Sequence, residues 1–125
     1  MSVARYAAAQ NAAATPREIE IRAFRYVNGL LAGAGDVPAR ATALQKTIQL
    51  WTILLTDLAS DGNALPDELK ARLISLGLWA QREAASRMMD DASLSPLIEL
   101  HRDMLAGLEA QRPAAPMPAF RTGTA

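Results

Sequence analysis

The chain has 125 residues, half of them apolar and only 5% aromatic, and its thirteen basic residues balance thirteen acidic ones. It contains no cysteine, which excludes disulfides, thiolate catalysis and cysteine-based zinc sites. A neutral chain lacks the excess positive charge of a nucleic-acid binder, and no apolar run approaches the roughly 18 residues that span a bilayer. We therefore expect a single-domain cytoplasmic protein with neither a membrane nor a nucleic-acid partner.

The first strong signal for a helix stands at residues 15–18. Before it, residues 1–14 are small and polar, with Tyr6 as the one aromatic, which favours an N-terminal arm or a loose helix. Thr15 is a suitable N-cap, Pro16 fits the first helical position and Glu18 completes a capping box. The pattern predicts a helix that runs to about Ala34.

That first helix is predicted to end because Gly33, Gly35 and Pro38 follow one another. Glu20 lies within its apolar arc, near Phe24. A buried carboxylate is costly unless it is paired. Glu20 is therefore an edge position, a member of a structural ion pair or a contact for a partner.

A second helix is predicted over residues 39–59. Its apolar face is formed by Leu44, Ile48, Trp51, Leu55 and Leu58. Ile53 falls on the polar side instead, which makes it a candidate contact for another protein.

The third predicted helix, over residues 66–89, is apolar on two sides. One stripe consists of Leu69, Leu73, Leu76, Ala80 and Ala84. Roughly opposite lie Ile74, Leu78, Ala85 and Met89, with Trp79 between the two stripes. Such a helix is either central in its bundle or covered by a partner, and both alternatives stay open here.

A fourth helix is predicted to begin near Ser93 or Ser95 and to end near Gln111. Its buried stripe is predicted to be Leu97, Leu100, Met104 and Leu108. His101 falls inside this arc, which favours a hydrogen-bonded core histidine over a metal ligand. Residues 112–125 hold three prolines and no helical period, so we expect a disordered tail. The predicted fold is all-α, a small bundle of about four helices over residues 15–111.

The sequence offers no constellation of residues for catalysis. It has one histidine and no cysteine, few of its acids fall on apolar faces, and no phosphate-binding glycine motif is present. We predict that the protein is not an enzyme, with no catalytic residue, no cofactor and no metal site.

Four segments together resemble the FlaF family of alphaproteobacterial flagellar proteins. They are Tyr6 with Pro16-Arg17, Glu20, Arg22 and Phe24; Leu50-Trp51 with Leu54 and Asp57; residues 62–66 with residues 74–76 and Trp79; and residues 96–99 with Met104 and Gly107-Leu108. The resemblance covers about residues 3–110. The one departure is Ile21, where the family often has Tyr.

The resemblance implies a cytoplasmic, regulatory helper of flagellin that promotes its synthesis or secretion and acts alongside FlbT, a regulator of flagellin translation. We hypothesise that an apolar groove binds a flagellin segment, with one wall on the second apolar side of the third helix. The candidate partner-binding residues are Ile74, Leu78, Trp79, Met89, Ile53, Arg17 and Glu20. On this hypothesis Leu78→Asp or Trp79→Ala weakens flagellin binding while the domain stays helical.

The alternative function is post-transcriptional regulation through FlbT or the flagellin messenger, without chaperoning. Its contact surface would be Arg17, Arg22 and Arg25. A structural subunit of a helical assembly is a third class, and the sequence leaves the oligomeric state open.

Overall fold

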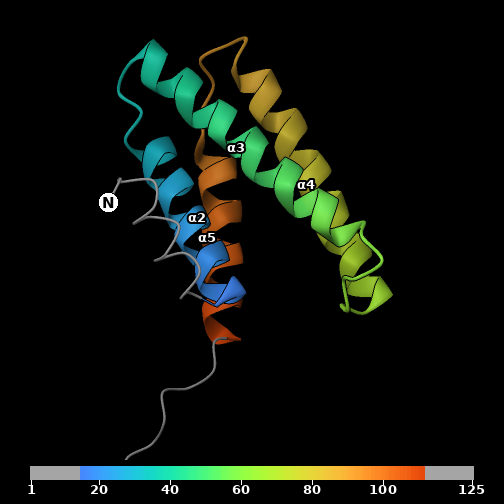
Figure 1. The fold of residues 1–125 in the computed structure, drawn as a ribbon. Coiled ribbons are helices and arrows are strands. Elements are labelled where there is room, and N and C mark those ends of the chain that lie inside the picture. Colours follow the sequence, from blue (N-terminus) through green and yellow to red (C-terminus); the bar gives the residue numbers. More distant parts are fainter. Residues whose placement is uncertain (1–14, 112–125) are drawn as a thin grey trace, which may run out of the picture.

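The computed structural model describes residues 15–111, and this part of the chain contains four helices and no strand. The helices are α2 (Pro16–Ala32), α3 (Val37–Leu58), α4 (Asp67–Arg87) and α5 (Ser95–Ala110) (Figure 1). The all-α prediction is confirmed. The predicted arm over residues 1–14 and the predicted tail over residues 112–125 lie outside the described residues.

The start of α2 is capped as its sequence predicts. The Glu18 N–H donates a hydrogen bond to Thr15 Oγ1 over 3.1 Å, and Pro16 occupies the first turn. The helix ends two residues earlier than predicted, at Ala32. Gly33 is the C-cap, and its N–H donates to the carbonyl oxygen of Gly29.

The prediction that Pro38 helps to end the first helix was wrong. Pro38 lies instead in the first turn of α3, where a proline loses no helical hydrogen bond. Asp36 is the N-cap, because its Oδ1 accepts from the Ala39 N–H over 2.8 Å. This cap starts α3 at Val37, two residues before the predicted position.

The helices form two pairs that separate at one end. Helix α4 returns along α3, α5 lies along α2, and α2 also packs on α3, whereas α4 and α5 touch only weakly (Figure 1). The start of α5 lies near the end of α4. From there the two pairs diverge, so that the end of α5 and the start of α4 stand apart.

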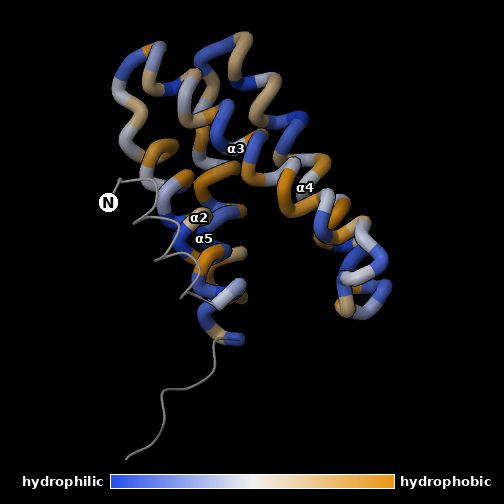
Figure 2. The backbone as a smooth tube through the Cα atoms, viewed as in Figure 1, coloured by the Kyte–Doolittle hydropathy of each residue, from blue (hydrophilic) through white to orange (hydrophobic). Residues whose placement is uncertain are grey.

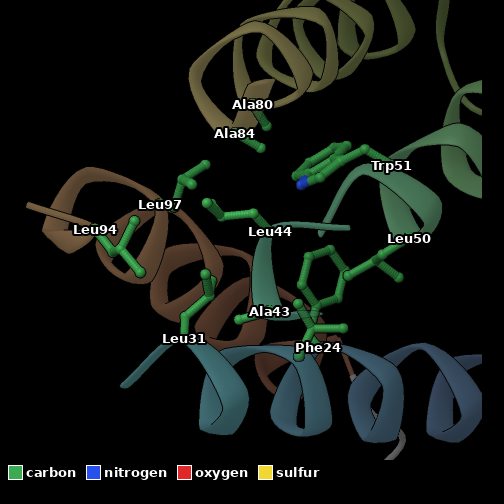
Figure 3. Packing of buried hydrophobic residues seen from close by; sticks show 11 residues of the cluster. Phe24, Leu31, Ala43, Leu44, Leu50, Trp51, Ala80, Ala84, Leu94 and Leu97 are labelled. Carbon is green, nitrogen blue, oxygen red and sulfur yellow. The ribbon is translucent and has the colours of Figure 1, made fainter. Parts of the chain in front are cut away.

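The core lies where the pairs meet. Leu44 and Trp51 of α3 and Leu97 of α5 are fully buried. So are Ala80 and Ala84 of α4, which face Leu44 and Trp51 in Figure 3. Apolar positions recur along each helix between polar ones (Figure 2). This is the pattern by which amphipathic helices bury a shared face.

Helix α4 docks on α3 through small residues, which include the two alanines of its first predicted stripe but none of the leucines of that stripe. Its buried positions are Gly77, Ala80 and Ala84. A Cβ added at Gly77 would lie 2.8 Å from Trp51 Cε3 and 2.8 Å from Leu55 Cδ2. Small residues allow this close approach of two helix backbones, which leaves the leucines Leu69 and Leu76 beside the contact and exposed.

An aromatic cluster joins α2, α3 and α5. The Trp51 Nε1–H donates to His101 Nε2 over 3.0 Å, and Phe24 meets both rings edge-on. Burial lowers the pKa of His101 to about 4, so the ring is neutral at physiological pH. The prediction of a hydrogen-bonded core histidine is confirmed.

Candidate partner-binding groove

An apolar groove opens where the two helix pairs diverge. It has a volume of about 300 Å³ and lies between the first half of α4 and the last half of α5. Its apolar walls are Leu54, Leu58, Leu65, Leu69, Leu73, Met104 and Leu108. The buried rings of Phe24 and Trp51 form its base. We call this feature the end groove.

The end groove stays open because of the distribution of side-chain sizes along α4. The small docking residues Gly77, Ala80 and Ala84 bring the second half of α4 close to α3. The first half instead carries Leu69 and Leu73, which face the groove. Leu69 remains 37% exposed, so the bundle leaves apolar surface here that a second polypeptide would bury favourably.

The connection between α3 and α4 holds one edge of the groove in place. The Asn63 Nδ2–H donates to Asp57 Oδ2 over 3.0 Å, and Asn63 Oδ1 accepts from the Leu65 N–H over 3.1 Å. These two bonds tie residues 63–65 back to the end of α3. Leu65 thereby lines the groove together with residues from the last turns of α5.

Charged groups surround the apolar walls. Arg17 and Glu20 come from α2, Asp57 from α3 and Asp103 from α5. Burial raises the pKa of Glu20, the neighbouring Arg17 lowers it in part, and the negative charge of Asp57 raises it further. Within residues 15–111, the Glu20 carboxylate accepts no hydrogen bond, and no basic side chain lies close enough to form an ion pair with it. The rim therefore carries a partly desolvated negative charge.

The structure brings two of the predicted partner-binding residues together, since Arg17 and Glu20 both line the end groove. The other five lie outside it. Ile74 is half-buried, and the remaining four are exposed: Leu78, Trp79, Met89 and Ile53. Their predicted role in partner binding stays a prediction.

The groove therefore follows a different side of α4 from the predicted wall of Ile74, Leu78 and Met89. The sequence pattern places Leu69 and Leu73 in one apolar stripe without indicating what covers it. The run of small residues at positions 77, 80 and 84 was the available signal, because it marks the side on which α4 docks.

The arginines of α2 do not form a single basic surface. Arg25 is paired with Glu109 of α5, and Arg17 lies beside Glu20 at the groove. Arg22 is exposed, and neither it nor the half-buried Arg17 forms an ion pair with a residue of the range 15–111. This arrangement gives little support to a phosphate-binding face.

Two further features of residues 15–111 bear on function. No group of histidine and acidic side chains in this part of the chain is arranged to hold a metal ion. None of the four described helices combines the length and apolar character that crossing a membrane requires.

Fold and groove thus describe a small helical protein whose described residues leave an apolar surface uncovered. The model of the family "Flagellar protein FlaF" matches residues 2–108. The chain belongs to the FlaF family, and its role is accordingly a flagellar one. Neither a curated protein nor a solved structure matches the chain significantly.

Proposed function

We propose that this FlaF protein binds flagellin and promotes its synthesis and secretion in the manner of an export chaperone. The observation that carries the proposal is the end groove, an open apolar surface in a chain of a flagellar family. Flagellin before assembly exposes segments that become amphipathic helices in the filament. Covering such a segment prevents premature association.

The shape and chemistry of the end groove suit a helical occupant. An amphipathic helix places anchors at positions i, i+3, i+4 and i+7 on one side, which matches a trough walled by leucines from three helices. Each large apolar side chain that becomes fully buried contributes about 1.5–3 kcal/mol. Met104 adds a flexible wall residue that adapts to related flagellin sequences.

The proposal includes action alongside the translational regulator FlbT. Flagellin held in the end groove would leave the outer side of α4, with Leu78 and Trp79, free for another protein. Co-purification of the three proteins tests this. Recovery of a complex containing all three supports joint action, and strict exclusion of FlbT by flagellin contradicts it.

The regulatory alternative makes a different prediction about salt. Binding to the flagellin messenger would weaken steeply as salt rises, because each phosphate contact releases counterions. Apolar burial has no such steep dependence. A messenger complex of high affinity with this salt dependence, found without any flagellin complex, would favour the alternative.

The direct experiment compares two leucines of α4 that have similar exposure. Leu69 is 37% exposed and lines the end groove, whereas Leu78 is 44% exposed and lies outside it. Both Leu69→Asp and Leu78→Asp should stay folded, as circular dichroism can check. We expect Leu69→Asp to abolish co-purification with the cognate flagellin and Leu78→Asp to retain it.

The opposite result would indicate that flagellin contacts the outer side of α4, as the sequence alone predicted. Truncation of each flagellin end then identifies the bound segment. Binding that survives removal of both ends would contradict a disordered-end occupant, and failure of the unaltered protein to bind flagellin would contradict the proposal as a whole.

A further inference from the structure

We infer that the end groove is selective for the charge of its occupant: it takes an amphipathic helix whose apolar face is flanked by a lysine or arginine, and that cation pairs with Glu20 and Asp57. For the identity of the partner, this inference rests on the proposed function. It adds the chemistry by which one segment is chosen over another.

The charge balance of the rim is the first reason. Glu20, Asp57 and Asp103 bring three carboxylates to the groove, against the single guanidinium of Arg17. A helix laid into the groove removes water from all four groups. A charge that loses water without gaining a partner is costly, so an occupant that brings a cation binds better than one that brings an acid.

The placement of Glu20 and Asp57 is the second reason. They come from different helices, yet the negative charge of Asp57 acts on Glu20 and disfavours its ionised form. The attraction of Arg17 outweighs this repulsion, but burial removes water from Glu20, and this largest effect keeps the pKa of the carboxyl raised. A cation brought beside the two carboxylates by an occupant would stabilise the charge of Glu20 in place of the water that burial removes.

The neighbouring apolar walls suit the rest of such a side chain. Leu54, Leu58 and Leu69 line the same groove as the two carboxylates. A lysine or arginine buries its methylene stem on apolar surface while its head reaches a polar rim. The groove therefore offers both halves of the contact to one long basic side chain.

The test uses a variant that removes the two charges and keeps the side-chain shapes. Glu20→Gln combined with Asp57→Asn is that variant, and the new amide oxygen at position 57 can still accept a hydrogen bond from Asn63. The matched control is Glu99→Gln, which removes an exposed carboxylate on α5 outside the groove. Affinity for the cognate flagellin is measured by calorimetry at low and at raised salt.

We expect the double variant to bind flagellin about tenfold more weakly at low salt. It should also lose most of the salt dependence that the unaltered protein shows, while Glu99→Gln behaves like the unaltered protein. In the reciprocal experiment, each basic residue of the bound flagellin segment is changed to Glu. One such change should weaken binding to the unaltered protein and be rescued by Glu20→Lys.

The possible failures are distinguishable. If the unaltered protein binds flagellin and Leu69→Asp abolishes binding, but the double variant binds as well as the control, the proposed function stands and the charge inference is overturned. If the unaltered protein binds no flagellin, the proposed function falls and the inference falls with it.

Other occupants of the groove give other results. If deletion of residues 112–125 removes the effect of the double variant, the carboxylates serve this chain's own C-terminal segment. If the unaltered protein is a dimer that the double variant dissociates, as sedimentation would show, they serve a second copy. Either result overturns the inference of a basic partner.

Discussion

The two ends of this helical bundle use the same kind of residue for different purposes. We call the end of the bundle where the end of α4 meets the start of α5 the closed end. There Leu44 is fully buried, and Arg40 of α3 donates hydrogen bonds to the carbonyl oxygens of Arg87 and Ala92. At the open end, Leu69 lines the end groove and remains 37% exposed. One leucine stabilises the fold, and the other is available for contact.

The difference originates in α4, where side-chain size changes along the helix. Its second half has glycine and alanine on the side that packs on α3, and its first half has leucines beside that side. Close approach at one end and separation at the other follow from this gradient. The comparison teaches that a helix apolar on two sides need not be central in its bundle.

The largest expected effect belongs to the closed end. Leu44→Ala removes a fully buried side chain from a packed core, and should lower the free energy of unfolding by about 2–5 kcal/mol. Urea unfolding followed by circular dichroism measures this. A loss below about 1 kcal/mol would show that the closed end is not the stabilising core described here.

The second effect depends on pH and on His101. Its pKa of about 4 in the folded protein lies below the usual 6.5, so the unfolded chain binds the proton more readily. The contribution of the neutral His101 to the free energy of unfolding is therefore fully present above pH 6.5. It is lost as the pH falls from 6.5 toward 4. Between about pH 7.5 and pH 5 the loss should be roughly 2 kcal/mol.

Glu20 acts in the opposite sense, because its raised pKa contributes stability at low pH that is lost as the pH rises above 4.5. The pH series is therefore best measured with Glu20→Gln as the background. An NMR titration of His101 in that background provides the control. A midpoint near 6.5 for the folded protein would contradict a neutral, buried ring.

The third effect concerns the closest approach of α4 to α3. In Gly77→Ala, the new methyl group would collide with the Trp51 ring, which its hydrogen bond to His101 holds in place, although Leu55 can turn aside. We expect a net loss of about 1–2 kcal/mol, because overpacking outweighs the gain in helix propensity.

Gly29→Ala is the matched control for that substitution. Gly29 also lies within a helix, but nothing comes within 4 Å of an added Cβ. This variant should be more stable by about 0.4–1 kcal/mol. Equal effects of the two substitutions would contradict the close approach at Gly77.

The smallest effect on stability is expected at the open end. Leu69→Ala shortens a partly exposed side chain and should change the free energy of unfolding by less than about 1 kcal/mol. Binding to flagellin should nevertheless weaken measurably, since the groove loses part of a wall. A large loss of stability with unchanged binding would place Leu69 in the core.

Much of the fold was predictable because its signals are local. The Thr15 cap, the Pro16 start and the spacing of apolar residues in each helix identified four helices with bounds within about two residues. The exception at Pro38 has the same physical origin, since a proline both follows helices and begins them. The residue that decides between these cases is Asp36, whose side chain caps α3.

The groove was not predictable to the same degree, because helical period shows that a side is apolar but not what covers it. Leu69 and Leu73 share the period of Ala80 and Ala84, yet only the alanines are buried. Glu20 is the informative residue: an acid within an apolar arc predicts an edge position, a structural ion pair or a partner contact, and it lies at the groove. Whether a predicted contact residue binds a partner is decided by the surface of that partner, which this sequence does not contain.

Hydrogen exchange of this protein, with and without bound flagellin, tests the central claim most directly. Flagellin in the end groove should slow exchange in residues 63–73 and in the last turns of α5, at residues 103–110. The outer side of α4 around Leu78 and the closed end should change little. Protection confined to residues 78–89, or no protection while flagellin is bound, would contradict the account.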